Sequence, residues 1–170
     1  IRPNKGAMIS AQAAGTVTKV LVKSGDKVKK GQLLVEIDSS AERASLKATE
    51  AQLPAAQANY NRYRNLVSSN SASKAELDNA QSTYNQLLAT IESTKAQIER
   101  RQIYAPFDGE AGIVNVNVGQ YVTVGTEIVR VEDQSAMKIR FTLPQTNLED
   151  IFVGQKVTAT IDALPARTFP

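Results

Sequence analysis

The sequence contains neither cysteine nor histidine among its 170 residues. Without cysteine it cannot form disulfides, thiolate zinc sites or a cysteine nucleophile. Without histidine it lacks imidazole-based catalytic triads, histidine metal ligands and the side chain that most often acts as a general base near neutral pH. Carboxylate or lysine chemistry would still be open to it. The composition nevertheless predicts a protein that is not an enzyme and that has no catalytic residue, no cofactor and no metal site.

Long hydrophobic runs are also missing. The apolar runs extend over only a few residues, whereas a helix that crosses a bilayer needs roughly 20. The chain opens with Ile1 rather than methionine, so we interpret it as part of a longer protein. We therefore expect any membrane anchor or targeting segment to lie outside these 170 residues.

Charge is unevenly distributed along the chain. The net charge is +3, but residues 1–38 alone carry +4 and residues 103–133 carry −4. The basic half includes a lysine cluster made of Lys19, Lys23, Lys27, Lys29 and Lys30. Aromatic residues make up only 5% of the sequence, and none lies among these lysines to stack on a base. A solvated sheet face is therefore favoured over a nucleic-acid-binding surface.

Two stretches that lie 94 positions apart share one spacing of residues, GDKVKKGQLLVEID at 25–38 and GQYVTVGTEIVRVE at 119–132. The matching positions are Gly25, Val28, Gly31, Leu34, Val35, Ile37 and Asp38, and then Gly119, Val122, Gly125, Ile128, Val129, Val131 and Glu132. Glycines at fixed turn positions between short runs rich in valine and isoleucine predict two similar sets of strands. Val114, Val116 and Val118 alternate in the same manner before the second set.

Between the two stretches the apolar spacing changes from two residues to about 3.5. Apolar residues and threonine occupy positions 46, 49, 53, 56, 60, 63 and 67, and then positions 77, 80, 84, 87, 91, 94 and 98. The polar run SSNSAS at 68–73 separates these two seams and favours a turn. This pattern predicts an antiparallel helical hairpin with arms of about 28 residues, or roughly 42 Å each.

Capping boxes are expected at the start of both helices, Ser39 with Glu42 and Ser73 with Glu76. Pro54 lies inside the first arm, where proline costs about 3 kcal/mol. Because the seam stays in phase on both sides of it, we expect a local kink rather than a break.

Two strand sets that are each too small for a core can pair face to face. The predicted fold is α+β, with a β-sandwich made of residues 15–38 and 103–133, split by a hairpin at 39–102 whose tip is near 66–73. Residues 134–170 read as strand, helical turn and strand, and residues 1–14 form an N-terminal segment that is a candidate barrel strand.

The repeated half-motif resembles the biotinyl/lipoyl carrier fold, in which a modified lysine occupies the turn that joins the halves. The corresponding stretch here, IDSSAE at 37–42, has no lysine. A carrier domain of an enzyme is therefore kept only as the alternative from a different functional class.

The order of half-lipoyl, hairpin, half-lipoyl and barrel strands resembles the periplasmic adaptor (membrane fusion) proteins of tripartite multidrug efflux pumps of the resistance-nodulation-division type. The motifs that carry the resemblance are GTVTKVLVKSGDKVKKGQLLVEID, IYAPFDGEAGIVNVNVGQYVTVGTEIVRV and the predicted hairpin tip. This resemblance implies a lipoyl-like sandwich, a coiled-coil hairpin and part of a β-barrel in residues 134–170.

The family's tip motif is an arginine, a leucine four residues later and a serine seven after that, which this sequence provides as Arg62, Leu66 and Ser73. The resemblance implies that the tip binds an outer-membrane exit duct. It also implies an inner-membrane efflux transporter as the second partner, self-association into a ring of six, and a periplasmic location at the inner membrane. An adaptor of a type I secretion system or an ABC-type exporter is the nearest alternative.

Overall fold

The computed structural model describes residues 2–138, 142, 152–155, 159–160 and 168–169. Contacts divide the chain into two units, one of Pro3–Met137 and one of Ile1–Arg2 with Lys138–Pro170. The first unit holds two β-sheets and two long helices, α1 (Ser40–Ser68) and α2 (Lys74–Arg100). The chain is thus a mixed helix-and-sheet protein, as the sequence predicted.

Eight strands form two four-stranded sheets. One sheet has the order β1-β8-β6-β3 and contains Arg2–Ser10, Glu127–Lys138, Gly109–Val114 and Lys27–Val28. The other has the order β5-β4-β2-β7 and contains Gln102–Tyr104, Leu33–Ile37, Gly15–Val20 and Tyr121–Val122. Each sheet therefore combines strands that precede the helices with strands that follow them.

The two sheets repeat each other residue by residue. Val17 lies opposite Ile37 between β2 and β4, and Ala111 lies opposite Val131 between β6 and β8, at an offset of 94 positions. Each short strand pairs with a strand of the other half, and in β7 Val122 lies opposite Gly15 of β2. In β3, the equivalent residue Val28 lies opposite Gly109 of β6. The sequence repeat therefore corresponds to a pseudo-twofold axis in the structure.

Backbone hydrogen bonds show that the structural repeat begins before Gly25 and Gly119, the first of the matched sequence positions. The amide of Gly31 donates to the carbonyl of Ala105 over 2.8 Å, and the amide of Gly125 donates to the carbonyl of Ala11 over 2.9 Å. Gly25, Gly31, Gly119 and Gly125 have φ values of 88°, 78°, 86° and 89°. Residues other than glycine rarely adopt φ values in this range, which explains why both halves have glycine at these turns.

The core lies between the two sheets. Its largest fully buried side chains are Leu34, Ile37, Ile128, Val17, Val35, Val122, Val129 and Val131. Both halves contribute equivalent residues, so neither half could bury them alone. One expectation was wrong: Val118 does not continue the apolar face of Val114 and Val116, because it lies in the turn before β7 and is 64% exposed.

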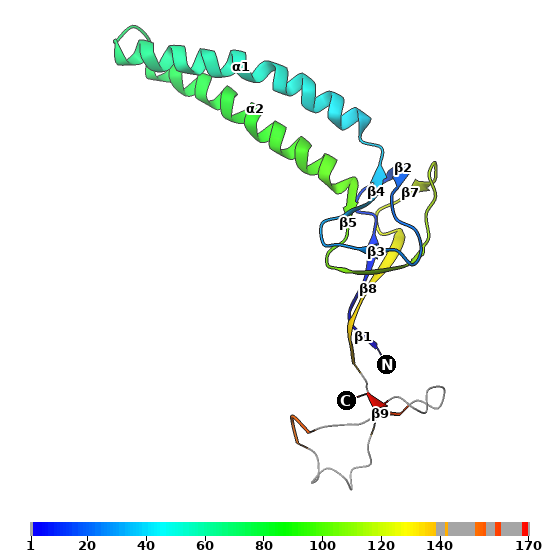
Figure 1. The fold of residues 1–170 in the computed structure, drawn as a ribbon. Helices are drawn as coiled ribbons and strands as arrows, with labels where there is room; N and C mark the ends of the chain where they lie inside the picture. Colours follow the sequence, from blue (N-terminus) through cyan, green and yellow to red (C-terminus); the bar gives the residue numbers. More distant parts are fainter. Residues whose placement is uncertain (1, 139–141, 143–151, 156–158, 161–167, 170) are drawn as a thin grey trace. The chain divides into compact units, whose positions relative to one another are not determined.

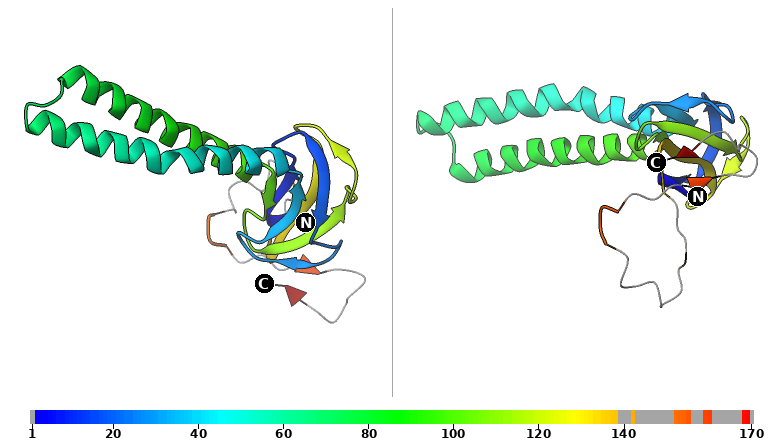
Figure 2. Two further views of the ribbon diagram at one scale, coloured as in Figure 1. Left: turned by 90° about the horizontal axis from the view of Figure 1, so that it is seen from above. Right: turned by 60° about the horizontal axis from the view of Figure 1, so that its bottom comes forward.

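Helices α1 and α2 run antiparallel and pack along their length, as Figures 1 and 2 show. Every position of the two predicted seams is buried or half-buried, and Ala80, Ile91 and Thr94 are the most buried on α2. Tyr60 of α1 stacks on Tyr84 of α2, with ring centroids 5.9 Å apart and planes 2° from parallel. Helix–helix packing at the predicted spacing is thus confirmed.

The two predicted capping boxes have different outcomes. Ser73 caps α2 as expected, but the Ser39 side chain makes no capping hydrogen bond to α1. Its hydroxyl instead accepts a hydrogen bond from Nε of Arg43 over 2.9 Å, and the Glu42 carboxylate pairs with Arg101. The prediction for Ser39 was wrong because both partners of the box bind other side chains.

Helix α1 continues through Pro54 without interruption. Because proline cannot donate the backbone hydrogen bond to residue 50, and because residue 54 is exposed, replacing it with alanine removes a cost without leaving a cavity. We expect Pro54→Ala to stabilise the hairpin by up to about 3 kcal/mol and to raise its melting temperature, as measured by circular dichroism. A lower melting temperature would contradict this expectation.

In the second unit the structure describes an antiparallel pair of short strands, β9 (Ala159–Thr160) and β10 (Thr168–Phe169). Most of the stretch that was expected to begin a barrel, residues 134–170, lies outside the described residues.

Candidate functional site

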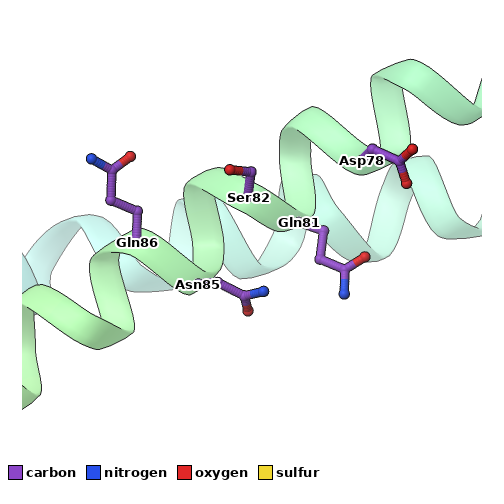
Figure 3. A pocket seen from close by; sticks show the side chains of 5 residues that line it. All are labelled: Asp78, Gln81, Ser82, Asn85 and Gln86. Atoms are coloured by element: carbon purple, nitrogen blue, oxygen red, sulfur yellow. The ribbon is translucent and has the colours of Figure 1, made fainter.

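The described residues contain no group of three or more acidic, histidine or cysteine side chains that could hold a metal ion. An open hollow of about 560 Å³ on the outer face of α2 is lined by Asp78, Gln81, Ser82, Asn85 and Gln86 (Figure 3). With a single ionisable group, it provides no acid–base pair. Among the described helices, none is long and apolar enough to cross a membrane.

The hairpin tip is built by hydrogen bonds from its own serines. The carbonyl of Asn65 accepts from the hydroxyl of Ser68 over 2.6 Å, and the carbonyl of Leu66 accepts from the amide of Ser71 over 2.8 Å. Asn70 is in the left-handed region with a φ of 55°, which asparagine tolerates better than most residues. These contacts close the connection between the helices in five residues, 69–73.

Ser73 begins α2 with a complete capping box. Its hydroxyl accepts from the amide of Glu76 over 3.3 Å, and its own amide donates to the Glu76 carboxylate over 2.8 Å. The same amide, followed by the Ser73 hydroxyl, lowers the pKa of Glu76. Because a lowered pKa favours the ionised form in the folded state, this cap is present at neutral pH and weakens only as acid protonates Glu76.

The other two predicted tip residues lie on the last turns of α1. Arg62 is exposed and has no ion-pair partner within the described part of the chain, whereas Leu66 is half-buried beside the seam. Arg64 lies over the ring of Tyr60, 5.9 Å from its centroid. The structure thus places Arg62, Leu66 and Ser73 at the same end of the hairpin, with Arg62 and Ser73 accessible to a partner.

Sequence reasoning missed a second polar centre, at the base of the hairpin. Arg101 caps the end of α2, and its guanidinium donates to the carbonyls of Ala14 and Asp38 over 3.1 and 2.6 Å. The pKa of Asp38 is lowered, chiefly by hydrogen bonds from the amide and hydroxyl of Ser40, with a contribution from the Arg101 charge. No local signal in the sequence separates Arg101 from its neighbour Arg100.

A family model described as the barrel-sandwich hybrid domain of RND membrane fusion proteins matches residues 5–134. This range contains both helices and most of the two sheets, so the chain belongs to the RND-type membrane fusion protein family. The family that the repeat and the tip motif resembled is thereby confirmed.

Similar curated proteins extend beyond this chain. A Haemophilus influenzae protein, described as uncharacterized, is 59% identical over 169 residues, which cover 99% of this chain and 44% of that protein. The multidrug resistance protein MdtA of Yersinia enterocolitica is 30% identical over 167 residues, covering 89% and 38% respectively. The chain thus spans less than half the length of these relatives.

Solved structures share the fold. A MacA–MexA chimeric protein that contains the Pseudomonas aeruginosa MexA α-hairpin domain superposes with a TM-score of 0.90 at 31% identity, over 99% of this chain and 62% of the chimera. A putative efflux transporter from Bacteroides eggerthii superposes with a TM-score of 0.80 at 24% identity, over 99% and 52%. The second match supports the fold alone.

Proposed function

We propose that this chain is part of a periplasmic adaptor that links an inner-membrane efflux transporter to an outer-membrane exit duct in a tripartite drug efflux pump. The observation that carries the proposal is a family-matched sandwich from which a helical hairpin projects, with Arg62 and Ser73 exposed at its far end. Holding a tip so far from the body requires many ordered residues, and a contact made at that tip accounts for the arrangement.

The proposal assigns a role to each part. Residues 15–38 and 103–133 are the halves of a lipoyl-like domain, residues 39–102 form a coiled-coil hairpin, and residues 134–170 belong to an incomplete barrel. Copies associate into a ring, with six as the proposed number, and a segment outside this chain attaches the protein to the inner membrane. The protein has no enzymatic activity of its own, so the transporter supplies the energy for transport.

Docking at the tip rests on complementary chemistry. The Arg62 guanidinium can form forked hydrogen bonds to a carboxylate or to backbone carbonyls of the duct. The half-buried Leu66 presents part of an apolar surface beside it, and Ser73 adds a small hydroxyl at the start of α2. Among the described residues Arg62 has no ion pair that would have to break before it binds a partner.

Capture of a purified outer-membrane exit duct by the immobilised chain tests this proposal. We expect Arg62→Asp to reduce the captured duct by at least about tenfold, because loss of a paired charge at an interface costs about 2–5 kcal/mol. Lys47→Asp is the matched control, since Lys47 is also exposed on α1 but lies near the base of the hairpin. Equal capture by both variants would show that the tip is not the docking site.

A further inference from the structure

Arg101 joins three segments at the base of the hairpin. Its guanidinium donates to the carbonyl of Ala14 before β2 and to the carbonyl of Asp38 after β4, and it pairs with the carboxylate of Glu42 in the first turn of α1. Its own carbonyl accepts from the amide of Ile37 over 2.8 Å. One residue at the end of α2 therefore contacts the start of α1 and one edge of the sandwich.

This ion pair is more shielded than the one higher on the hairpin. The side chains of Arg101 and Glu42 are 20% and 19% exposed, whereas those of Lys95 and Glu50 are 59% and 44% exposed. A partly buried arginine that binds one carboxylate and two carbonyls is held in a defined orientation. An exposed lysine pair is screened by water and salt, and it contributes little.

The sandwich leaves a space for this guanidinium. A Cβ atom at Gly15 would lie 2.8 Å from Nη1 of Arg101 and 2.7 Å from Cγ2 of Ile37, so a larger residue there would displace these side chains. In the other half the equivalent residue is Gly109, and the corresponding space is filled by the carbonyl of Glu132, 2.5 Å from a Cβ placed there. Only the sheet that carries the hairpin therefore has room for the arginine, although the two sheets have equivalent strand pairing.

The same contact explains why Glu42 does not complete a capping box with Ser39. Glu42 occupies the position from which a glutamate would normally bond back to the amide of Ser39, yet its carboxylate binds Arg101 instead. A local contact within α1 is therefore exchanged for one between the two helices. This contact constrains how α1 and α2 lie relative to each other more than it stabilises either helix.

We infer that Arg101 is a positioning residue that fixes the direction in which the hairpin leaves the sandwich. This inference rests on the proposed function, in which the tip must meet its partner at a defined place. Without the guanidinium, the hairpin would still be joined to the sandwich through β4 and β5, but its base would lose the contacts to Ala14 and Glu42 that restrict its direction.

Distances between the hairpin and the sandwich test the inference directly. Because the chain has no cysteine, Lys29→Cys in the sandwich and Gln81→Cys on α2, both at exposed positions, accept spin labels at these two sites alone. We expect one narrow distribution of spin–spin distances in the parent chain and in Arg100→Gln, the matched control. In Arg101→Gln the distribution should become at least about twofold wider, as expected for a loosened hinge.

Two further variants separate positioning from folding. Arg101→Lys keeps the charge but not the fork and should give an intermediate width, whereas Glu42→Gln tests the ion pair with the arginine in place. Circular dichroism should show parental helix content in each. Equal widths in Arg101→Gln and Arg100→Gln would overturn the inference, as would a parental width in both Glu42→Gln and Arg101→Lys. Since the isolated chain is measured, failure of docking at the tip would leave these distances unchanged.

Discussion

Full-length protein that carries Arg62→Asp should fail to confer drug resistance while it melts at nearly the parental temperature. Arg62 is exposed, and it makes no ion pair in the described residues, so reversing its charge should change stability by about 0.5 kcal/mol or less. Contact with a carboxylate or carbonyl of the duct would instead become repulsive. The minimum inhibitory concentration of an exported drug, at equal expression, measures the effect.

Ser73→Asp should have the same effect on resistance, since it places a negative charge where, under the proposed function, the partner would meet a hydroxyl. Aspartate is as good an N-cap as serine, but the Ser73 hydroxyl also donates to the Glu76 carboxylate over 2.8 Å. Aspartate would repel that carboxylate, so a modest local cost accompanies the change. Ser73→Asn is the control that caps without charge and should retain resistance. Parental resistance in both Arg62→Asp and Ser73→Asp would refute docking at the tip.

Leu34→Ala should destabilise the sandwich by about 2–5 kcal/mol, because it removes a fully buried side chain and leaves a cavity. A small domain is stabilised by only about 5–15 kcal/mol in total, so this is a large share. Ile128 occupies the equivalent position in the other half and is also fully buried. Ile128→Ala should therefore cost a similar amount, although it lies on the other side of the helical insertion.

Hydrogen exchange of sandwich peptides during urea titration measures these costs separately from the helices. Leu21→Ala is the matched control, since Leu21 is 52% exposed and its loss should cost less than about 1 kcal/mol. If Ile128→Ala had as small an effect as the control while Leu34→Ala unfolded both sheets, the two halves would not share one cooperative core.

The features that the sequence predicted well follow from side-chain periodicity. Positions spaced by three and four residues face one side of a helix whatever lies around it, so the seams were correctly placed over two arms of 29 and 27 residues. The glycine turns were equally clear because few other residues tolerate their φ values. Both signals are local and need no knowledge of the surrounding fold.

The features that it missed depend on contacts between distant residues. Ala11 and Ala105 begin the structural repeat through backbone hydrogen bonds, although both lie upstream of the seven matched positions. The bond from Arg101 to Ala14 joins residues 87 positions apart. Ser39 and Ser73 have the same local pattern, but Arg43 binds the Ser39 hydroxyl and Arg101 binds Glu42, so only the box at Ser73 forms.

Strands β4 and β5 are paired neighbours, and they lead directly into α1 and out of α2. Together with the contacts of Arg101, these strands join the sandwich to the base of the hairpin. Seven residues added to each arm would keep the apolar seams in phase and extend the hairpin by about 10 Å. Reach is thus an independent variable in this architecture, one that evolution or an engineer can adjust in whole heptads while the sheets keep their sequence.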